Sequence, residues 1–164
     1  MKRISQLAAA LLLLGVLSTA EAARPGRISK VLPHWLDLQG RHTLSPSLLE
    51  RDAYQTKLRA DRSLCSGIRF DVKWAKNTGG NVTLQLELHV TGEAKPIVLK
   101  QPIKPSRRSG WDAVTLDGDA FKAIGKIVAW QVRLLDGDIE LAKRRSFLWT
   151  ERKPAGDAEK PAAD

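Results

Sequence analysis

Hydrophobic and polar positions alternate strictly in three segments of this chain, at residues 68–74, 82–90 and 128–134. In each segment the even-numbered residues are hydrophobic, and most residues between them are polar. A period of two over such lengths predicts a β-strand with one buried face. Strands buried on a single face are typical of antiparallel sheets, because parallel sheets are usually covered on both faces. The pattern therefore predicts an antiparallel β-protein.

Weaker strand signals lie around these segments, at residues 31–38, 96–103, 111–116 and 139–149. Pro33 breaks the first of them, so we expect only a short strand there. The prolines in and after the second favour a sheet edge, because proline cannot donate a ladder hydrogen bond. Two glycine-containing stretches, residues 77–80 and 136–138, are typical of hairpin turns.

The last of these segments has an interrupted hydrophobic side. Leu141, Phe147 and Trp149 should share one face of a strand. The Lys-Arg-Arg run at residues 143–145 interrupts that face, so we expect a bulge or a sheet edge there.

These segments predict about seven strands with short, mostly hairpin connections. Two sheets packed face to face accommodate this number, so we predict a sandwich of the immunoglobulin or fibronectin III type. A small closed β-barrel is the alternative. Trp74 and Trp130 fall on the hydrophobic faces of two central strands and are predicted core residues.

One short helix is expected before the sheets. Ser47 and Glu50 have the spacing of a capping box, and the helix should run from Ser47 to about Arg59. Residues 119–124 are expected to form one further helical turn, which Gly125 ends.

The first 22 residues have the layout of a secretory signal peptide. Two positive residues precede an uncharged hydrophobic run at residues 7–17, and Ala20 and Ala22 supply the small residues of a cleavage site. The run is too short to span a bilayer and no second one follows, so we expect no transmembrane anchor. The protein should be exported, to a periplasm or to the medium.

After cleavage we expect a single domain. Residues 23–62 form an N-terminal segment with a short strand and the helix, which packs onto a β-sandwich core at residues 63–150. Residues 151–164 are rich in Ala, Pro and charged residues, and they are expected to be a disordered tail.

Two stretches of the sequence carry a resemblance. The first runs from Leu32 to Gln55 and begins Leu-Pro-His-Trp-Leu-Asp-Leu-Gln-Gly-Arg-His. The second combines Ala-Trp-Gln-Val-Arg-Leu at residues 129–134 with Ser-Phe-Leu-Trp at residues 146–149. Together they resemble a group of uncharacterised exported bacterial proteins, over most of the chain after the leader. The resemblance implies bacterial export and an immunoglobulin-like β-sandwich, and it carries no activity, ligand or catalytic residue.

The chain is basic, with a formal net charge of +9, or +8 without the leader. A basic exported protein can meet anionic polymers, such as polysaccharide, lipid headgroups or nucleic acid. The candidate anion-binding residues are Arg107, Arg108, Lys143, Arg144 and Arg145. Cations at a sheet edge also prevent aggregation between edges without any ligand, and we favour this interpretation.

Cys65 is the only cysteine, so no disulfide can form within the chain. We interpret it as a small buried residue, with a reactive or intermolecular thiol as the alternative. No residue pattern indicates a metal or another cofactor, because the Cys and His clusters that such sites need are missing from the sequence.

Polar groups are densest between residues 34 and 55. They are His34, Asp37, Arg41, His42, Glu50, Arg51, Asp52, Tyr54 and Gln55. Histidine beside a carboxylate can serve a hydrolase as base and orienting group, but no spacing here matches a catalytic or metal motif. The favoured interpretation is that these residues hydrogen-bond the loop before the helix onto the sandwich.

The outward side of the 128–134 strand is unusually hydrophobic for a sheet face in water. Its residues are Ile127, Ala129, Gln131, Arg133 and Leu135, and the last strand would add Leu148. We expect something to cover this face. The candidates are the helix at residues 47–59 or the segment that precedes it, with a partner protein or a second copy of the chain as the alternative.

Three classes of function therefore remain open. The favoured one is a non-enzymatic, exported β-sandwich that binds another envelope protein or itself, because the chain lacks catalytic signatures. A basic module for an anionic polymer is the alternative, and its affinity should fall steeply with salt. A hydrolase built on the segment from His34 to Gln55 is the third.

Overall fold

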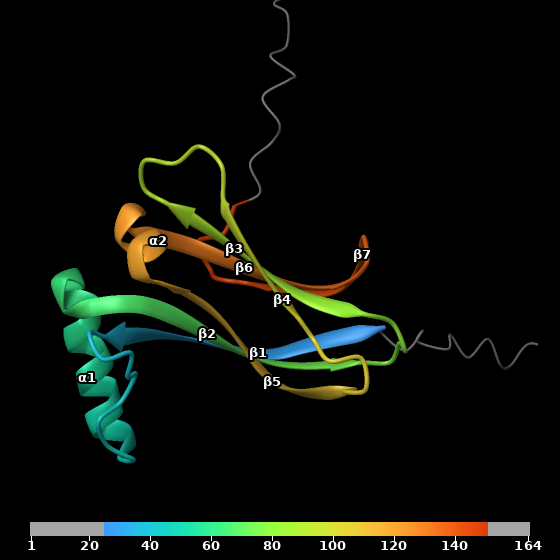
Figure 1. The fold of residues 1–164 in the computed structure, drawn as a ribbon, viewed down its shortest axis with the longest axis horizontal. Coiled ribbons are helices and arrows are strands. Elements are labelled where there is room, and N and C mark those ends of the chain that lie inside the picture. Colours follow the sequence, from blue (N-terminus) through green and yellow to red (C-terminus); the bar gives the residue numbers. More distant parts are fainter. Residues whose placement is uncertain (1–24, 151–164) are drawn as a thin grey trace, which may run out of the picture.

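The structure is a computed structural model that describes residues 25–150, and these form two antiparallel β-sheets packed face to face (Figure 1). One sheet has the order β1-β2-β5, with bounds Gly26–Asp37, Cys65–Lys76 and Ser109–Asp117. The other has the order β4-β3-β6-β7, with bounds Ile97–Pro102, Val82–Val90, Ile127–Asp136 and Ile139–Arg145. The prediction of a mostly β, antiparallel protein with two sheets is confirmed. The expected signal peptide and tail lie outside the described residues.

The core lies between the sheets and consists of the alternating hydrophobic residues that define the three clearest strands. Its fully buried members include Phe70, Val72, Leu84, Leu86, Leu88, Val132 and Leu134. Trp74 is also buried, and its Nε1 donates a hydrogen bond of 2.7 Å to Asp112 on β5. Trp130 packs edge-to-face on Phe70 with ring centroids 6.1 Å apart, but it is only partly buried. The period of two therefore identifies the inner faces correctly.

The expected hairpin at residues 77–80 is wrong, because β2 and β3 belong to different sheets. The chain crosses from one sheet to the other at this point. Buried Lys76 holds the crossing: its Nζ donates to Gly80 O at 2.7 Å and to Pro105 O at 3.3 Å. Glycine-rich residues permit a tight turn but do not specify which strands pair, since pairing depends on distant residues.

Only two connections between strands in residues 25–150 are hairpins, β3–β4 and β6–β7, so the expectation of mostly hairpin links is also wrong. The β6–β7 turn is the one predicted at residues 136–138. Asp136 pairs with Ile139, and Gly137 has the positive φ of 59° that such a two-residue loop requires.

The prolines behave as edge residues. Pro33 does not break β1, which continues through it to Asp37 and pairs Pro33 with Phe70. The strand tolerates proline because β1 is an edge strand and its free side needs no ladder hydrogen bond. The expected edge position of β4 is confirmed, and β7 is an edge strand as well.

A register shift at the start of β6 changes the faces of two residues. His89 pairs with Ala129 and Val90 with Ile127, so Val128 has no partner on β3. Ile127 therefore packs against the core, whereas Val128 is 48% exposed. The prediction that Ile127 faces outward is wrong, because a bulge shifts the alternation by one residue.

The last predicted strand ends early, at Arg145, and a turn follows. Ser146 N donates to Trp130 O, and Trp149 N donates to Ser146 O. Phe147 is fully exposed, while Trp149 is 8% exposed and packs on His89 with ring centroids 4.2 Å apart. The expectation that Phe147 and Trp149 share the face of Leu141 is therefore wrong, since the turn ends the period of two.

The helix α1 (Leu48–Ala60) has nearly the predicted bounds and lies beside β1 (Figure 1). Ser47 is its N-cap residue, but its side chain makes no capping hydrogen bond, so the capping box is wrong. The short 3-10 helix η1 (Arg62–Leu64) follows. Cys65 is buried, and its Sγ donates to Leu58 O at 3.2 Å. Burial raises the pKa of the thiol, which keeps it protonated and unreactive at neutral pH.

The second helix, α2 (Gly118–Ala123), connects the two sheets and buries Phe121. Gly125 directly follows its C-cap residue Ile124 as predicted, but it lacks the positive φ of a typical helix-ending glycine. No helix within residues 25–150 is long and apolar enough to cross a membrane.

We predict that Trp149→Ala lowers the free energy of unfolding by about 3 kcal/mol, because it removes a large buried side chain. Phe147→Ala, the matched control in the same turn, should change it by less than about 0.5 kcal/mol. Chemical denaturation of both variants measures the two effects. Equal losses of stability would contradict the burial assigned to Trp149.

Candidate functional site

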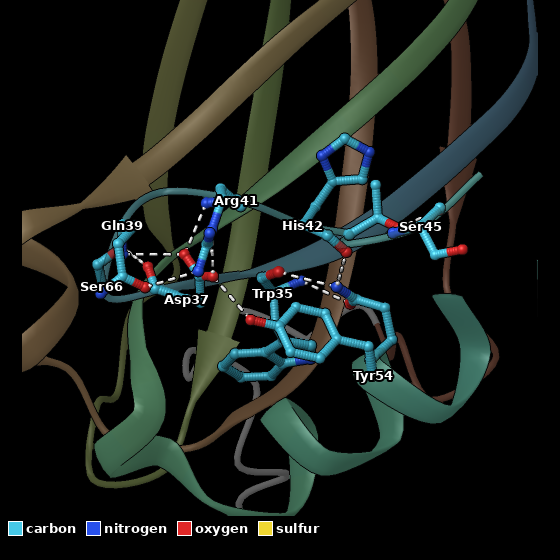
Figure 2. A network of polar contacts seen from close by, with 10 residues as sticks. Trp35, Asp37, Gln39, Arg41, His42, Ser45, Tyr54 and Ser66 are labelled. Carbon is cyan, nitrogen blue, oxygen red and sulfur yellow. Dashed lines mark hydrogen bonds and ion pairs between the residues drawn. The ribbon is translucent and has the colours of Figure 1, made fainter. Parts of the chain in front are cut away.

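The residues of the polar segment form two clusters, and the first is centred on Asp37 at the end of β1 (Figure 2). Tyr54 on α1 points its hydroxyl at Asp37 and donates to Oδ2 at 2.7 Å. Arg41 donates through Nε and its backbone N, each at 2.8 Å, and Gln39 N donates at 2.9 Å. These bonds fasten the loop after β1 and the helix to the sheet.

Asp37 is buried but charged. Burial by itself raises the pKa of this carboxyl, but the hydrogen bonds from Tyr54 and Arg41 outweigh burial and lower the pKa to about 2. Tyr54 has a raised pKa, first because it donates a hydrogen bond to the Asp37 carboxylate. At neutral pH Asp37 is therefore a charged acceptor and Tyr54 a protonated donor.

The Gln55 side chain hydrogen-bonds the free edge of β1, in the place that the backbone of a neighbouring strand would take. Its Oε1 accepts from Trp35 N at 2.8 Å, and its Nε2 donates to Trp35 O at 2.9 Å and to His42 O at 2.8 Å. The backbone of Trp35 is thereby satisfied on its free edge. Its indole packs edge-to-face on Phe121, with ring centroids 5.9 Å apart.

The second cluster contains His34 and His42, whose ring centroids lie 5.0 Å apart. His34 Nε2 lies 3.5 Å from Asp71 Oδ2, and Arg69 pairs with the same carboxylate at 2.9 Å. Burial lowers the pKa of both histidines, and the charges of Arg69 and Arg51 lower it further, while the charge of Asp71 opposes this shift. Both imidazoles are therefore neutral at pH 7.

Two of the predicted polar residues, Glu50 and Asp52, are exposed on α1 and belong to neither cluster. Within residues 25–150, no group of three or more His, Cys, Asp or Glu residues is arranged to hold a metal ion.

The candidate anion-binding residues do not form one surface. Arg107 pairs with Asp112 at 2.8 Å and lies 5.6 Å from the Trp74 ring, and Arg108 precedes β5. The run Lys143–Arg145 lies on β7, at the opposite edge of the sandwich. In that run Lys143 pairs with Glu140 at 3.4 Å, and Arg144 donates to Ser29 O on β1.

The outward face of β6 is covered by this chain itself. The prediction that the helix covers it is wrong, because α1 lies against the other sheet and Trp149 packs on this face beside His89. Ala129 and Gln131 are buried there, and Arg133 pairs with Glu140 at 2.7 Å and with Glu87 at 3.5 Å. Leu148 is 62% exposed and lies at the edge of this face.

A hydrophobic cleft with a volume of about 950 Å³ opens between the two sheets, and residues of α1 and α2 contribute to its lining. Both helices lie at the same end of the sandwich (Figure 1). One wall comes from β1 and β2, the other from β6 and the turn after β7, and the segment after α2 closes one end. Its hydrophobic lining residues are Pro33, Trp35, Ala60, Ile68, Phe70, Ile124, Ile127, Val128, Trp130, Phe147 and Leu148. Its volume is near the upper end of the range for small-molecule sites, about 300–1,000 Å³.

Four cations line this cleft, and no aspartate or glutamate does. Arg62 is bonded into the wall of the cleft. Its Nη1 donates to Gly125 O at 2.6 Å, and its Nη2 donates to Phe121 O. Its guanidinium also lies 4.4 Å from the Phe121 ring centroid. Arg59, Lys122 and Lys126 are exposed at the mouth.

The sequence pattern does not reveal this cleft. Its residues come from five separate parts of the chain, and only four of these residues belong to the faces that the three alternating segments assign to the core. The visible signal is Ile127-Val128, where two hydrophobic residues interrupt the alternation. An interruption of this kind is typical of a bulge, and bulges often lie beside binding sites.

We predict that Asp37→Asn lowers the free energy of unfolding at pH 7 by about 1–3 kcal/mol, because charged hydrogen bonds are lost. The folded-state pKa is lowered, so the stabilisation is complete above the normal pKa of 3.8 and is lost as the pH falls through about 2. The difference in free energy of unfolding between the unchanged protein and Asp37→Asn, measured by denaturation between pH 2 and 7, should therefore shrink as the pH falls. Asp52→Asn, an exposed control, should change stability by less than about 0.5 kcal/mol. If Asp37→Asn lowered stability by the same amount at all pH values, the lowered pKa of Asp37 would be refuted.

Comparisons with known proteins leave the geometry as the basis for function. No known family model matches this chain, and a search of curated proteins finds no significant match.

Proposed function

We propose that this protein is an exported, non-catalytic β-sandwich domain that binds a long-chain hydrophobic ligand in the cleft between its sheets. The cleft of about 950 Å³ is the observation that carries this proposal. Large concave sites lined by hydrophobic and aromatic side chains are the usual places where proteins bind small ligands.

The fold type that we propose is the immunoglobulin or fibronectin III type. A three-stranded sheet, β1-β2-β5, faces a four-stranded sheet, β4-β3-β6-β7. The chain changes sheets after β2, after β4 and after β5. This alternation between sheets supports a Greek-key sandwich of that type over a simple succession of hairpins.

The chemistry of the cleft supports binding over catalysis. Its lining contains no histidine, cysteine or carboxylate that could act as a base or a nucleophile. Ser146 is the one hydroxyl residue of the lining, and its Oγ accepts a hydrogen bond of 3.0 Å from Trp130 N. The two histidines lie outside the cleft and do not contribute to it.

Hydrophobic side chains at the mouth supply a driving force. Val128 is 48% exposed, Leu148 62% and Phe147 fully exposed, and all three line the cleft. A ligand that covers them removes hydrophobic surface from water, and each buried methylene of the ligand contributes about 0.8 kcal/mol. The arrangement therefore favours long aliphatic chains.

We predict that the chain beginning at Ala23, which contains every described residue, binds the uncharged fluorescent probe N-phenyl-1-naphthylamine at a saturable site. Val128→Asp should weaken this binding about tenfold, because it places a charge against the hydrophobic probe. A fluorescence titration gives the dissociation constants.

Val98→Asp is the matched control for this experiment. Val98 is 47% exposed on β4 of the same sheet, and it does not line the cleft. Its substitution should leave probe binding unchanged. The proposed function fails if no saturable binding occurs, or if the two valine variants weaken it equally.

A further inference from the structure

We propose that the ligand of the cleft is a single-chain amphiphile with an anionic head, of the fatty-acid class. The inference rests on the proposed function and adds the chemistry of the ligand. It follows from two features of the cleft: backbone groups of Trp35, Trp130 and Ser146 in its walls are already bonded within the chain, and exposed cations gather at one end of its mouth.

Several backbone groups in the walls of the cleft are already bonded within the chain. On β1, Pro33 has no N–H, and both backbone groups of Trp35 are bonded to the Gln55 side chain. On the opposite wall, Ser146 N donates to Trp130 O, and Ser146 O accepts from Trp149 N. A peptide would find few backbone partners at these positions, whereas an alkyl chain needs none.

The cations come from separate elements that meet at one place. Arg59 lies in the last turn of α1, Lys122 on α2, and Lys126 just before β6. Arg62 joins these segments through its hydrogen bonds to Gly125 O and Phe121 O. The charged end of the mouth therefore lies at the helices (Figure 1).

Two of these cations are free to bind an anion. Within residues 25–150, the side chains of Arg59 and Lys126 make no hydrogen bond or ion pair. Lys122 pairs with Asp119 at 3.4 Å, but both side chains are exposed and the pair is weak. An anionic head at this end would meet cations without displacing a strong internal partner.

The hydrophobic part of the cleft is of a size for one aliphatic chain. Its hydrophobic lining includes Ile124 after α2, Trp35 and Trp130 in the two walls, and Phe147 and Leu148 in the turn after β7. Its volume is that of a site for one small ligand. Head and chain thus have separate, adjacent binding surfaces.

Displacement of the bound neutral probe tests this inference. We use hexadecanoate, its uncharged methyl ester and hexadecyltrimethylammonium, each below its micelle concentration. Hexadecanoate should bind about tenfold more tightly than the other two, because only its charge is opposite to that of the rim. High salt should reduce this preference, since the rim cations are exposed.

The double variant Arg59→Gln/Lys126→Gln should lose the preference for hexadecanoate and retain the affinity for the methyl ester. Lys100→Gln/Lys104→Gln, a control with the same change in net charge at exposed sites away from the cleft, should keep the preference. The inference is overturned if the neutral probe binds but all three amphiphiles displace it equally, or if the rim variant keeps the preference. The proposed function fails separately, if the neutral probe does not bind at all.

Discussion

The close approach of the two sheets at one end is the constraint on which the cleft depends. Gly26, at the start of β1, lies so near β7 that a Cβ added there would be 2.8 Å from Leu141 Cβ. Only a residue without a side chain permits this contact. Toward the other end, the rings of Trp35, Phe70 and Trp130 line the cleft, and Phe70 and Trp130 pack edge-to-face across it. The sandwich is therefore closed at one end and open at the other.

The polar residues around α1 hold the open end of the sandwich in place. The four hydrogen bonds that the Asp37 carboxylate accepts fasten the end of β1, and Gln55 satisfies the backbone of Trp35. Because buried polar groups are costly when unpaired, this network also restrains the chain around it. The wall of the cleft that carries Trp35 is thereby held in place without a neighbouring strand. A segment rich in potential catalytic groups thus has a clear structural use.

The proposed function depends on the difference between the covered outer face of β6 and the open cleft. The outward face of β6 is already covered by Trp149, and its charges are paired among Glu87, Arg133 and Glu140. Three exposed hydrophobic residues, Val128, Phe147 and Leu148, instead line the cleft together with the unpaired cations Arg59 and Lys126. A ligand with an aliphatic chain and an anionic head would satisfy both at once, which neither a purely hydrophobic nor a purely charged ligand would do.

Local patterns in the sequence determined the strands and their inner faces, because the alternation of residues 68–74, 82–90 and 128–134 is a property of each segment alone. The turn at Gly137 was predictable for the same reason. Only the tertiary structure decided which strands pair with β2 and why Phe147 is exposed while Trp149 is buried. It also decided the division of the basic residues between two edges and the existence of the cleft. Each depends on contacts between residues far apart in the chain, and the free energy of such contacts is not encoded in any short segment.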